Sequence, residues 1–200
     1  MKRARAGVPP RELRLIGGRY KRRRLPVPDR PGLRPTPDRV RETLFNWLGQ
    51  DLSGWRVLDA FAGSGALGLE AASRGAAEVV LIERDAVSAA ALRASVQRLA
   101  AAGVQVVAAD ALAWMARAQP GCYDLVLIDP PFDAGLDAAA LALAAPLVAA
   151  DGWLYVESAH AVEPSPGWTL HRHGRAGAVH FQLLCRATPA LENDGGPRHN

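Results

Sequence analysis

Hydrogen-bond acceptors and an aromatic ring stand together in the tetrapeptide Asp129-Pro130-Pro131-Phe132. It follows the apolar run 123–128, whose length and branched side chains are typical of an interior strand of a parallel sheet. Neither proline has an N–H to donate, and Pro130 biases Asp129 toward an extended backbone. The Asp129 carboxylate and the Pro130 carbonyl therefore form a pair of fixed acceptors beside a ring.

Such an array suits methylation of the exocyclic amine of a nucleobase. The lone pair of that nitrogen is delocalised into the base, so it is a poor nucleophile until its hydrogens are drawn out of the plane. Two fixed acceptors can do this, and a carboxylate also stabilises the positive charge that develops on the nitrogen. The Phe132 ring would hold the base by stacking, which is worth about 1–3 kcal/mol. Alternatively, the prolines make a turn that closes the strand, and Asp129 caps the next helix. The tetrapeptide alone leaves both interpretations open.

Strand and helix patterns alternate from Trp55 onward, which predicts an α/β fold with a parallel sheet and helices on both of its faces. The predicted strands are 55–59, 78–82, 104–108, 123–128 and 152–157, and the segments 168–173 and 178–186 predict a closing hairpin. Acids stand at the ends of successive strands: Asp59, Glu83, Asp110 and Asp129. Because ligands of open α/β sheets bind at the carboxyl ends of the strands, we expect these acids to converge on one ligand site. Asp110 also suits the N-cap of the following helix.

The segment 63–68 reads Gly-Ser-Gly-Ala-Leu-Gly and matches the G-x-G-x-x-G pattern of dinucleotide-binding folds. Glu83 follows Gly65 by 18 residues, close to the spacing of about 20 at which an acid meets ribose hydroxyls. A nicotinamide- or flavin-dependent oxidoreductase is therefore one interpretation. It leaves Asp129–Phe132 without a role, and Asp59 at the tip of the first strand would repel a pyrophosphate.

The positive charge of the chain is concentrated at one end. Residues 1–41 contain 14 Lys or Arg and three acids, whereas the remaining 159 residues contain 10 Lys or Arg and 17 acids. This asymmetry indicates a polyanionic partner for the N-terminal segment. The basic run Arg19, Lys21, Arg22, Arg23 and Arg24 is the predicted phosphate contact, and a solvated tail is the alternative.

Other features restrict the class of protein. Two cysteines cannot build a disulfide framework and are typical of a cytoplasmic protein. The longest apolar run, 138–150, is short and contains Pro146, so we expect no membrane span. His171 and His173 have no third ligand nearby, so we expect no metal.

Several motifs occur together in a recognisable order. They are Ile16-Gly17-Gly18, Leu33-Arg34-Pro35-Thr36, the run Asp38 to Asn46 (DRVRETLFN), the run Asp59 to Gly68 (DAFAGSGALG) and Asp129-Pro130-Pro131-Phe132. From about Leu15 to Ser158 the chain resembles the bacterial small-subunit ribosomal RNA guanine-N2 methyltransferases. The resemblance implies a Rossmann-like class I methyltransferase fold, with a mostly parallel seven-stranded sheet and an antiparallel C-terminal hairpin. It also implies S-adenosyl-L-methionine as the cofactor.

The resemblance implies roles for particular residues. The catalytic residues would be Asp129, Pro130, Pro131 and Phe132. The cofactor-binding residues would be Asp59, Ala60, Phe61, Ala62, Gly63, Ser64, Gly65, Glu83, Arg84, Asp110 and Ala111, with Asp59 facing the sulfonium and Asp110 the adenine. RNA contacts would extend from the basic run to Arg34, Thr36, Arg39 and Arg41. The sequence departs from the family pattern at Arg22, where a glycine is usual.

The predicted organisation is a basic N-terminal arm (1–35), partly disordered and with residues 1–14 ordered only by a partner, a methyltransferase domain (36–186) and a disordered tail (187–200). By resemblance, the substrate is 16S ribosomal RNA, within a partly assembled small subunit, and the protein is a monomer. Three alternatives remain: methylation of adenine in DNA, a nicotinamide-dependent oxidoreductase, and a non-catalytic RNA-binding module.

Overall fold

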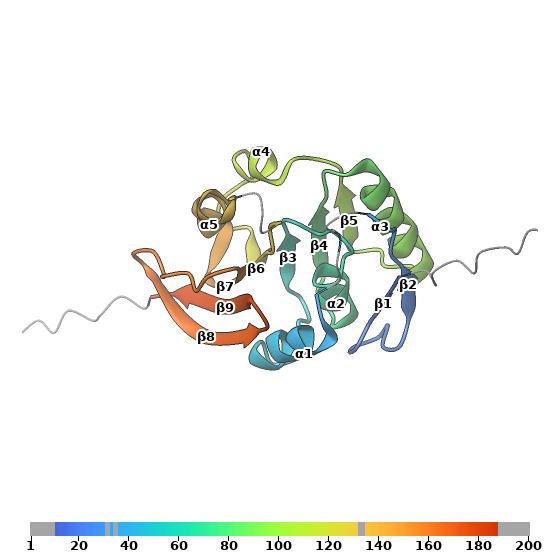
Figure 1. Ribbon diagram of the computed structural model, residues 1–200, viewed down its shortest axis with the longest axis horizontal. Coiled ribbons are helices and arrows are strands. Elements are labelled where there is room, and N and C mark those ends of the chain that lie inside the picture. Colours follow the sequence, from blue (N-terminus) through green and yellow to red (C-terminus); the bar gives the residue numbers. More distant parts are fainter. Residues whose placement is uncertain (1–10, 31–32, 34–35, 132–134, 188–200) are drawn as a thin grey trace, which may run out of the picture.

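The computed structural model describes residues 11–30, 33, 36–131 and 135–187 (Figure 1). Its centre is a seven-stranded sheet with the order β5-β4-β3-β6-β7-β9-β8, and a separate two-stranded sheet pairs β1 with β2. The strands of the large sheet are β3 (Arg56–Asp59), β4 (Glu78–Ile82), β5 (Val104–Val107), β6 (Tyr123–Ile128), β7 (Val148–Ser158), β8 (Trp168–Ala176) and β9 (Val179–Arg186).

The five strands β3 to β7 are parallel, and β9 runs antiparallel to both of its neighbours. β6 lies at the centre, and residues 125–128 are fully buried, as a continuous apolar run requires. The predicted α/β sheet with an antiparallel C-terminal hairpin is confirmed. The sequence placed some boundaries wrongly, since β7 begins at Val148, and β8 and β9 leave only residues 177–178 between them.

Helices cover both faces of the sheet (Figure 1). One face packs on α1 (Asp38–Trp47), α2 (Gly68–Ser73) and α3 (Ala86–Leu99), and the other packs on α4 (Ala111–Met115) and α5 (Asp137–Ala144), which continues into the short 3₁₀ helix η2 (Ala145–Leu147). Each face therefore has its own apolar cluster, and Leu58 and Val57, adjacent on β3, belong to different clusters because side chains alternate along a strand.

The basic N-terminal segment forms part of the folded core. Its strands β1 (Glu12–Arg14) and β2 (Arg24–Pro26) make an antiparallel hairpin, and Leu13, Leu15 and Leu25 are at most 2% exposed. The prediction that residues up to 14 are disordered is wrong for 11–14, because Leu13 contributes to the same apolar cluster as α1 and α2. Residues 1–10 and 188–200, the other segments predicted to be disordered, lie outside the described residues.

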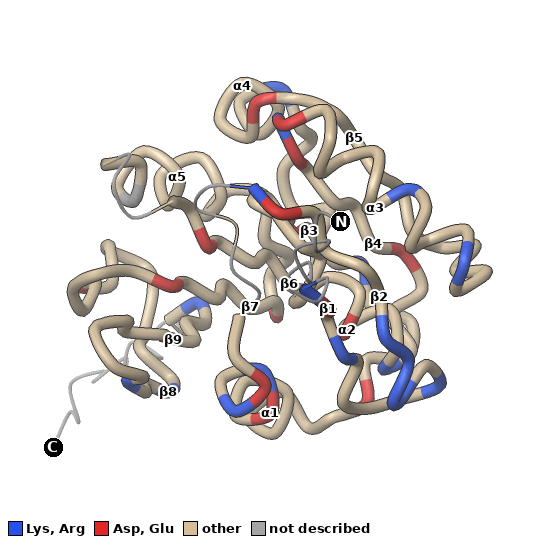
Figure 2. The backbone as a smooth tube through the Cα atoms, turned by 45° about the vertical axis from the view of Figure 1, so that its right-hand side comes forward, with Lys and Arg blue, Asp and Glu red and all other residues tan. Residues whose placement is uncertain are grey.

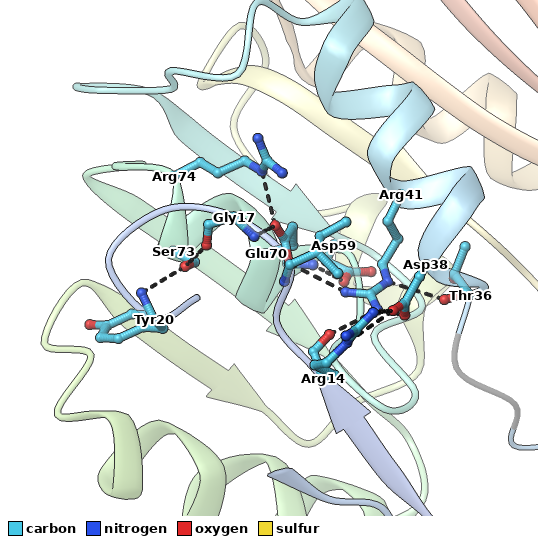
Figure 3. Close-up of polar contacts among 12 residues, drawn as sticks. Arg14, Gly17, Tyr20, Thr36, Asp38, Arg41, Asp59, Glu70, Ser73 and Arg74 are labelled. Atoms are coloured by element: carbon cyan, nitrogen blue, oxygen red, sulfur yellow. Dashed lines mark hydrogen bonds and ion pairs between the residues drawn. The ribbon is translucent and has the colours of Figure 1, made fainter. Parts of the chain in front are cut away.

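A buried carboxylate fastens this hairpin to α1 and α2 (Figure 3). Glu70 is fully buried, and its two oxygens accept from the backbone N–H groups of Ile16 and Gly17 at 2.9 and 2.7 Å. They also accept from Arg41 at 3.3 Å and from Arg74 at 3.0 Å. One acid therefore joins the N-terminal hairpin to two helices that are distant in sequence.

Gly18 shows how closely the hairpin approaches α2. Its φ of +67° lies in the left-handed region, and a Cβ atom there would stand 1.7 Å from the Ser73 carbonyl oxygen. Only glycine fits such a contact. Two adjacent hydrogen bonds complete the attachment: Arg19 N donates to the Ser73 carbonyl oxygen, and Tyr20 N donates to the Ser73 hydroxyl.

Candidate active site

A cavity of about 970 Å³ opens at the carboxyl ends of β3, β4, β5 and β6. Its walls include the four strand-end acids Asp59, Glu83, Asp110 and Asp129. The structure thus brings together the residues that sequence reasoning placed at one edge of the sheet. The cavity is large enough for a nucleoside-sized ligand together with part of a second molecule.

The glycine loop between β3 and α2 forms one wall of the cavity. Of the predicted cofactor-binding residues, Asp59, Ala60, Phe61, Ala62, Gly63, Ser64, Glu83, Arg84, Asp110 and Ala111 line it. Gly65 does not. Its φ is +78°, and a Cβ atom would stand 2.6 Å from Leu92 Cδ2, so Gly65 shapes the turn and the packing against α3.

Asp59 is 1% exposed and accepts from the backbone N–H of Gly68 at 2.9 Å. Burial raises the pKa of this carboxyl to about 7, with smaller effects from the N–H groups of Gly68 and Phe61, which lower it, and from the charges of Asp129 and Glu83, which raise it. A cation that entered the cavity beside Asp59 would favour its ionised form.

Glu83 and Asp110 are held by backbone donors. Glu83 accepts from Gly63 N at 2.9 Å and from Asp85 N at 2.7 Å, and each carboxylate oxygen keeps a lone pair for a ligand. Asp110 accepts from Ala113 N at 2.9 Å and is the N-cap of α4. The predicted capping role of Asp110 is confirmed, and this contact uses only one of the two carboxylate oxygens of a residue that also lines the cavity.

Asp129 stands at the carboxyl end of β6, with Pro130 and Pro131 beside it in the cavity wall. Burial raises the pKa of Asp129 to about 7, and a hydrogen bond from the Thr36 side chain acts in the opposite direction. Thr36 is 7% exposed and lines the same cavity, so the segment just before α1 reaches the predicted catalytic residue. Phe132 lies outside the described residues.

Sequence reasoning did not assign a role to Glu157. It lies near the end of β7, is 4% exposed, and accepts a 2.8 Å hydrogen bond from the Tyr155 hydroxyl. Burial, followed by the charge of Asp129, raises the pKa of Glu157 to about 8. The strand-end rule that found the other acids also applies to Glu157, so that signal was present in the sequence.

Arg30 was also missed as a residue of the cavity. It reaches the cavity wall from the proline-rich connector and pairs with Asp85, and this hydrogen bond is the main reason why the pKa of Asp85 falls to about 2. The charged residues of the cavity wall are then Asp59, Glu83, Asp85, Asp110 and Asp129 against Arg30 and Arg84. This excess of acids favours a cationic ligand over an anionic one.

The predicted RNA contacts fall into two groups, those exposed at the surface and those buried in the fold. Arg19, Lys21, Arg22, Arg23 and Arg24 are exposed on the β1–β2 hairpin, and Arg39 is exposed on α1; Figure 2 shows the hairpin's basic residues in blue. Arg22 has a φ of +68°, which accounts for the glycine usual there in similar sequences. Arg34 lies outside the described residues.

Arg41 requires a correction. It is 1% exposed, and its guanidinium donates to Glu70, Asp38 and the carbonyl oxygens of Thr36 and Arg14. A side chain so engaged cannot reach an RNA phosphate, so the prediction that Arg41 binds RNA is wrong, and its role is to hold the N-terminal hairpin. Thr36 likewise faces the cavity rather than an outer surface.

The described residues lack two kinds of feature. In that part of the chain, no three His, Cys, Asp or Glu side chains are grouped as metal ligands would be. His171 packs on Trp153 and His173 stacks on His180, because a bulge between Leu170 and Arg172 separates the two histidines. Within the same residues, no helix has the length and apolar character needed to cross a membrane.

The buried acids predict how stability depends on pH. The pKa values of Asp59, about 7, and of Glu157, about 8, lie above the value near 4 that these groups have in an unfolded chain. Their protonated forms favour folding, so their contribution is fully present below pH about 4 and is lost as the pH rises through 7 and 8. We expect the free energy of unfolding, measured with urea, to fall by roughly 7 kcal/mol between pH 5 and 9, at about 1.4 kcal/mol per pH unit for each group that titrates. Glu157→Gln should remove part of that fall, whereas a flat curve in the wild type would contradict the prediction.

The order of the strands, the glycine loop and the acid-lined edge give this protein the Rossmann-like fold that methyltransferases share. A methyltransferase from Geobacter sulfurreducens has the same fold, with a TM-score of 0.62, 14% identity, and coverage of 76% of this chain and 81% of that one. The chain belongs to the family described as Conserved hypothetical protein 95, whose model matches residues 13–185.

Named relatives are similar over nearly the whole chain. Ribosomal RNA small subunit methyltransferase D of Escherichia coli K12 is 45% identical, with coverage of 88% of this chain and 90% of the relative. The protein of the same name from Haemophilus influenzae is 38% identical, with coverage of 86% and 93%. The solved structure of yhhF from Escherichia coli matches with a TM-score of 0.79, 41% identity, and coverage of 88% and 98%.

Proposed function

We propose that this protein transfers a methyl group from S-adenosyl-L-methionine to the exocyclic N2 amine of a guanine in 16S ribosomal RNA. The observation that carries the proposal is the position of Asp129 and Pro130 in the wall of an acid-rich cavity that also contains the glycine loop. The names of the relatives, ribosomal RNA small subunit methyltransferase D, support RNA of the small subunit as the substrate.

The cavity suits this cofactor better than a dinucleotide. S-adenosyl-L-methionine carries an electrophilic methyl group on a positively charged sulfonium, and it has no phosphate. Asp59 would face the sulfonium, and a cation beside this buried acid would favour its ionised form. Glu83 would accept hydrogen bonds from the ribose hydroxyls, and Asp110 would accept one from the adenine amine. Gly63 lines the cavity next to Glu83 and has no side chain to occupy the space of the ligand. The same acids would repel the negative charges of a pyrophosphate.

Asp129 and the Pro130 carbonyl would draw the amine hydrogens out of the plane of the base. Because the acceptors are fixed by the end of β6 and by the two prolines, little reorganisation is needed as positive charge develops. A base in a helix cannot reach the cavity, so the guanine must be held out of its stack. Phe132 remains the predicted stacking residue.

The exposed arginines of the β1–β2 hairpin would hold the RNA backbone. We expect the triple substitution of Arg22, Arg23 and Arg24 by glutamine to weaken RNA binding and to lower the slope of log K against log salt by up to about three. The measurement is RNA binding at several salt concentrations. Arg117→Gln, at an exposed position after α4, is the control and should leave the slope unchanged. An unchanged slope in the triple variant would assign the hairpin charge to solvation alone.

The direct test is transfer of labelled methyl from S-adenosyl-L-methionine to unmodified small-subunit RNA, naked and in partly assembled particles, followed by nucleoside analysis. We expect N2-methylguanosine, with more label in the particles, and the protein acting as a monomer. Label on adenine would favour the related amine chemistry on that base. Failure to bind S-adenosyl-L-methionine would favour a nicotinamide cofactor, which a binding assay with NAD would check.

A further inference from the structure

Glu157 and Asp129 are neighbours across two parallel strands. Ile128 on β6 is in register with Val156 on β7, so the residues that follow them, Asp129 and Glu157, stand at the same level of the sheet. Adjacent strands lie about 4.8 Å apart, and side chains at the same level point to the same face. The two side chains therefore project from adjacent strands toward the same face of the sheet, and the charge of Asp129, which lines the cavity, acts on Glu157.

Within the part of the chain that the structure describes, no positively charged group is paired with Glu157. Tyr155 is fully buried and donates its hydroxyl to Glu157, and Phe181 of β9 stands in register on the other side. Trp47 of α1 stacks on Phe181 with ring centroids 5.3 Å apart, so the groups on that side of Glu157 are apolar. Among the described residues, Glu157 makes no salt bridge. The titratable groups that act on it are Asp129, Asp59 and Tyr155.

Two adjacent carboxyls in such a place do not both ionise at neutral pH. Asp129 is open to the cavity and receives the Thr36 hydroxyl, which favours its charged form, whereas Glu157 is 4% exposed. The proton that the pair retains is therefore best placed on Glu157. A protonated carboxyl is also a hydrogen-bond donor, and the Asp129 carboxylate on the neighbouring strand is an acceptor for it.

We propose that Glu157 is a positioning residue for Asp129: it stays protonated in the working enzyme and donates to the Asp129 carboxylate, which it keeps ionised and aimed at the amine. This inference rests on the proposed methyl transfer. Loss of that proton would leave two adjacent negative charges, which repel each other and turn Asp129 from its position. Activity should therefore decline at alkaline pH as well as at acid pH, where Asp129 itself is protonated.

Two substitutions separate this role from simple packing. Glu157→Gln keeps an N–H donor that cannot titrate, so we expect turnover within about threefold of the wild type and loss of the alkaline decline. Glu157→Leu keeps much of the volume but no donor, and its turnover should fall by about 10²-fold with little change in S-adenosyl-L-methionine binding. Tyr155→Phe removes a donor that favours ionised Glu157, so the alkaline decline should move to higher pH.

A second measurement needs no turnover. Carbon-13 NMR of the side-chain carboxyls, recorded against pH without cofactor, should show Glu157 titrating well above its ordinary range, and Glu157→Gln should remove that signal. Glu163→Gln, an exposed acid beyond β7, is the control and should change neither the NMR signals of the pair nor the pH profile of turnover.

Specific outcomes would overturn the inference. It fails if Glu157→Gln keeps the alkaline decline, if Glu157→Gln loses as much turnover as Glu157→Leu, or if the Glu157 signal titrates near pH 4. The proposed function fails separately, when the wild type transfers no methyl group to RNA although the NMR titration shows a protonated Glu157.

Discussion

Asp129→Ala is expected to reduce methyl transfer by at least about 10²–10³-fold, because it removes a fixed acceptor and a charge that act on the nitrogen as positive charge develops there. The same change should leave S-adenosyl-L-methionine binding nearly intact, since the contacts predicted for the ribose and adenine come from Glu83 and Asp110. Single-turnover rates and calorimetric titration with the cofactor measure the two effects separately.

Asp129→Asn refines this prediction. Asparagine keeps an acceptor oxygen of the same shape but loses the charge, so its rate should lie between those of the wild type and the alanine variant. Asp151→Ala, at an exposed position on β7, is the control, and its rate should equal that of the wild type. Undiminished turnover of Asp129→Ala would sink the assignment of Asp129 as the catalytic acceptor.

Glu70→Ala is expected to lower the free energy of unfolding by about 3–5 kcal/mol. The substitution would leave the buried guanidinium groups of Arg41 and Arg74 without their shared acid, and the N–H groups of Ile16 and Gly17 without an acceptor. Urea denaturation measures the loss. Limited proteolysis should also show cleavage within the β1–β2 hairpin, because Glu70 joins the hairpin to α1 and α2 (Figure 3).

Two other variants complete this test. Glu12→Ala breaks an exposed pair with Arg24 and should cost less than about 1 kcal/mol. Glu70→Gln keeps one acceptor oxygen and should destabilise less than alanine, which provides a folded protein if Glu70→Ala does not fold. A cost below about 1 kcal/mol for both Glu70 variants would show that apolar contacts alone hold the hairpin.

The sheet could be predicted from the sequence because its signals are local. The apolar run that forms β6 ends at Asp129. Strands and helices alternate from β3 to β7, and this alternation predicts that these strands pair in parallel. The rule that carboxyl ends of such strands meet at one edge then placed Asp59, Glu83, Asp110 and Asp129 around one cavity, as the structure shows. The antiparallel β9 does not alter this edge.

The partners of charged side chains could not be predicted in this way. Arg41 appears in the sequence as one of many N-terminal arginines, and only the packing of α1 on α2 shows that it is buried against Glu70, 29 residues away. The charge count of the arm therefore overstated the number of residues available to RNA.

The sequence by itself determined the elements, the edge of the sheet where the site lies, and the residue types that suit amine methylation. The elements and the site edge can be predicted because hydrophobic periodicity and the direction of parallel strands are set by residues close together in the sequence. Tertiary structure alone decided that Arg41 is a structural ion-pair partner, that Arg30 pairs with Asp85, and that the register of β6 and β7 brings Glu157 level with Asp129. The physical reason is that burial and strand register set the environment of an ionisable group, and both are properties of the assembled fold.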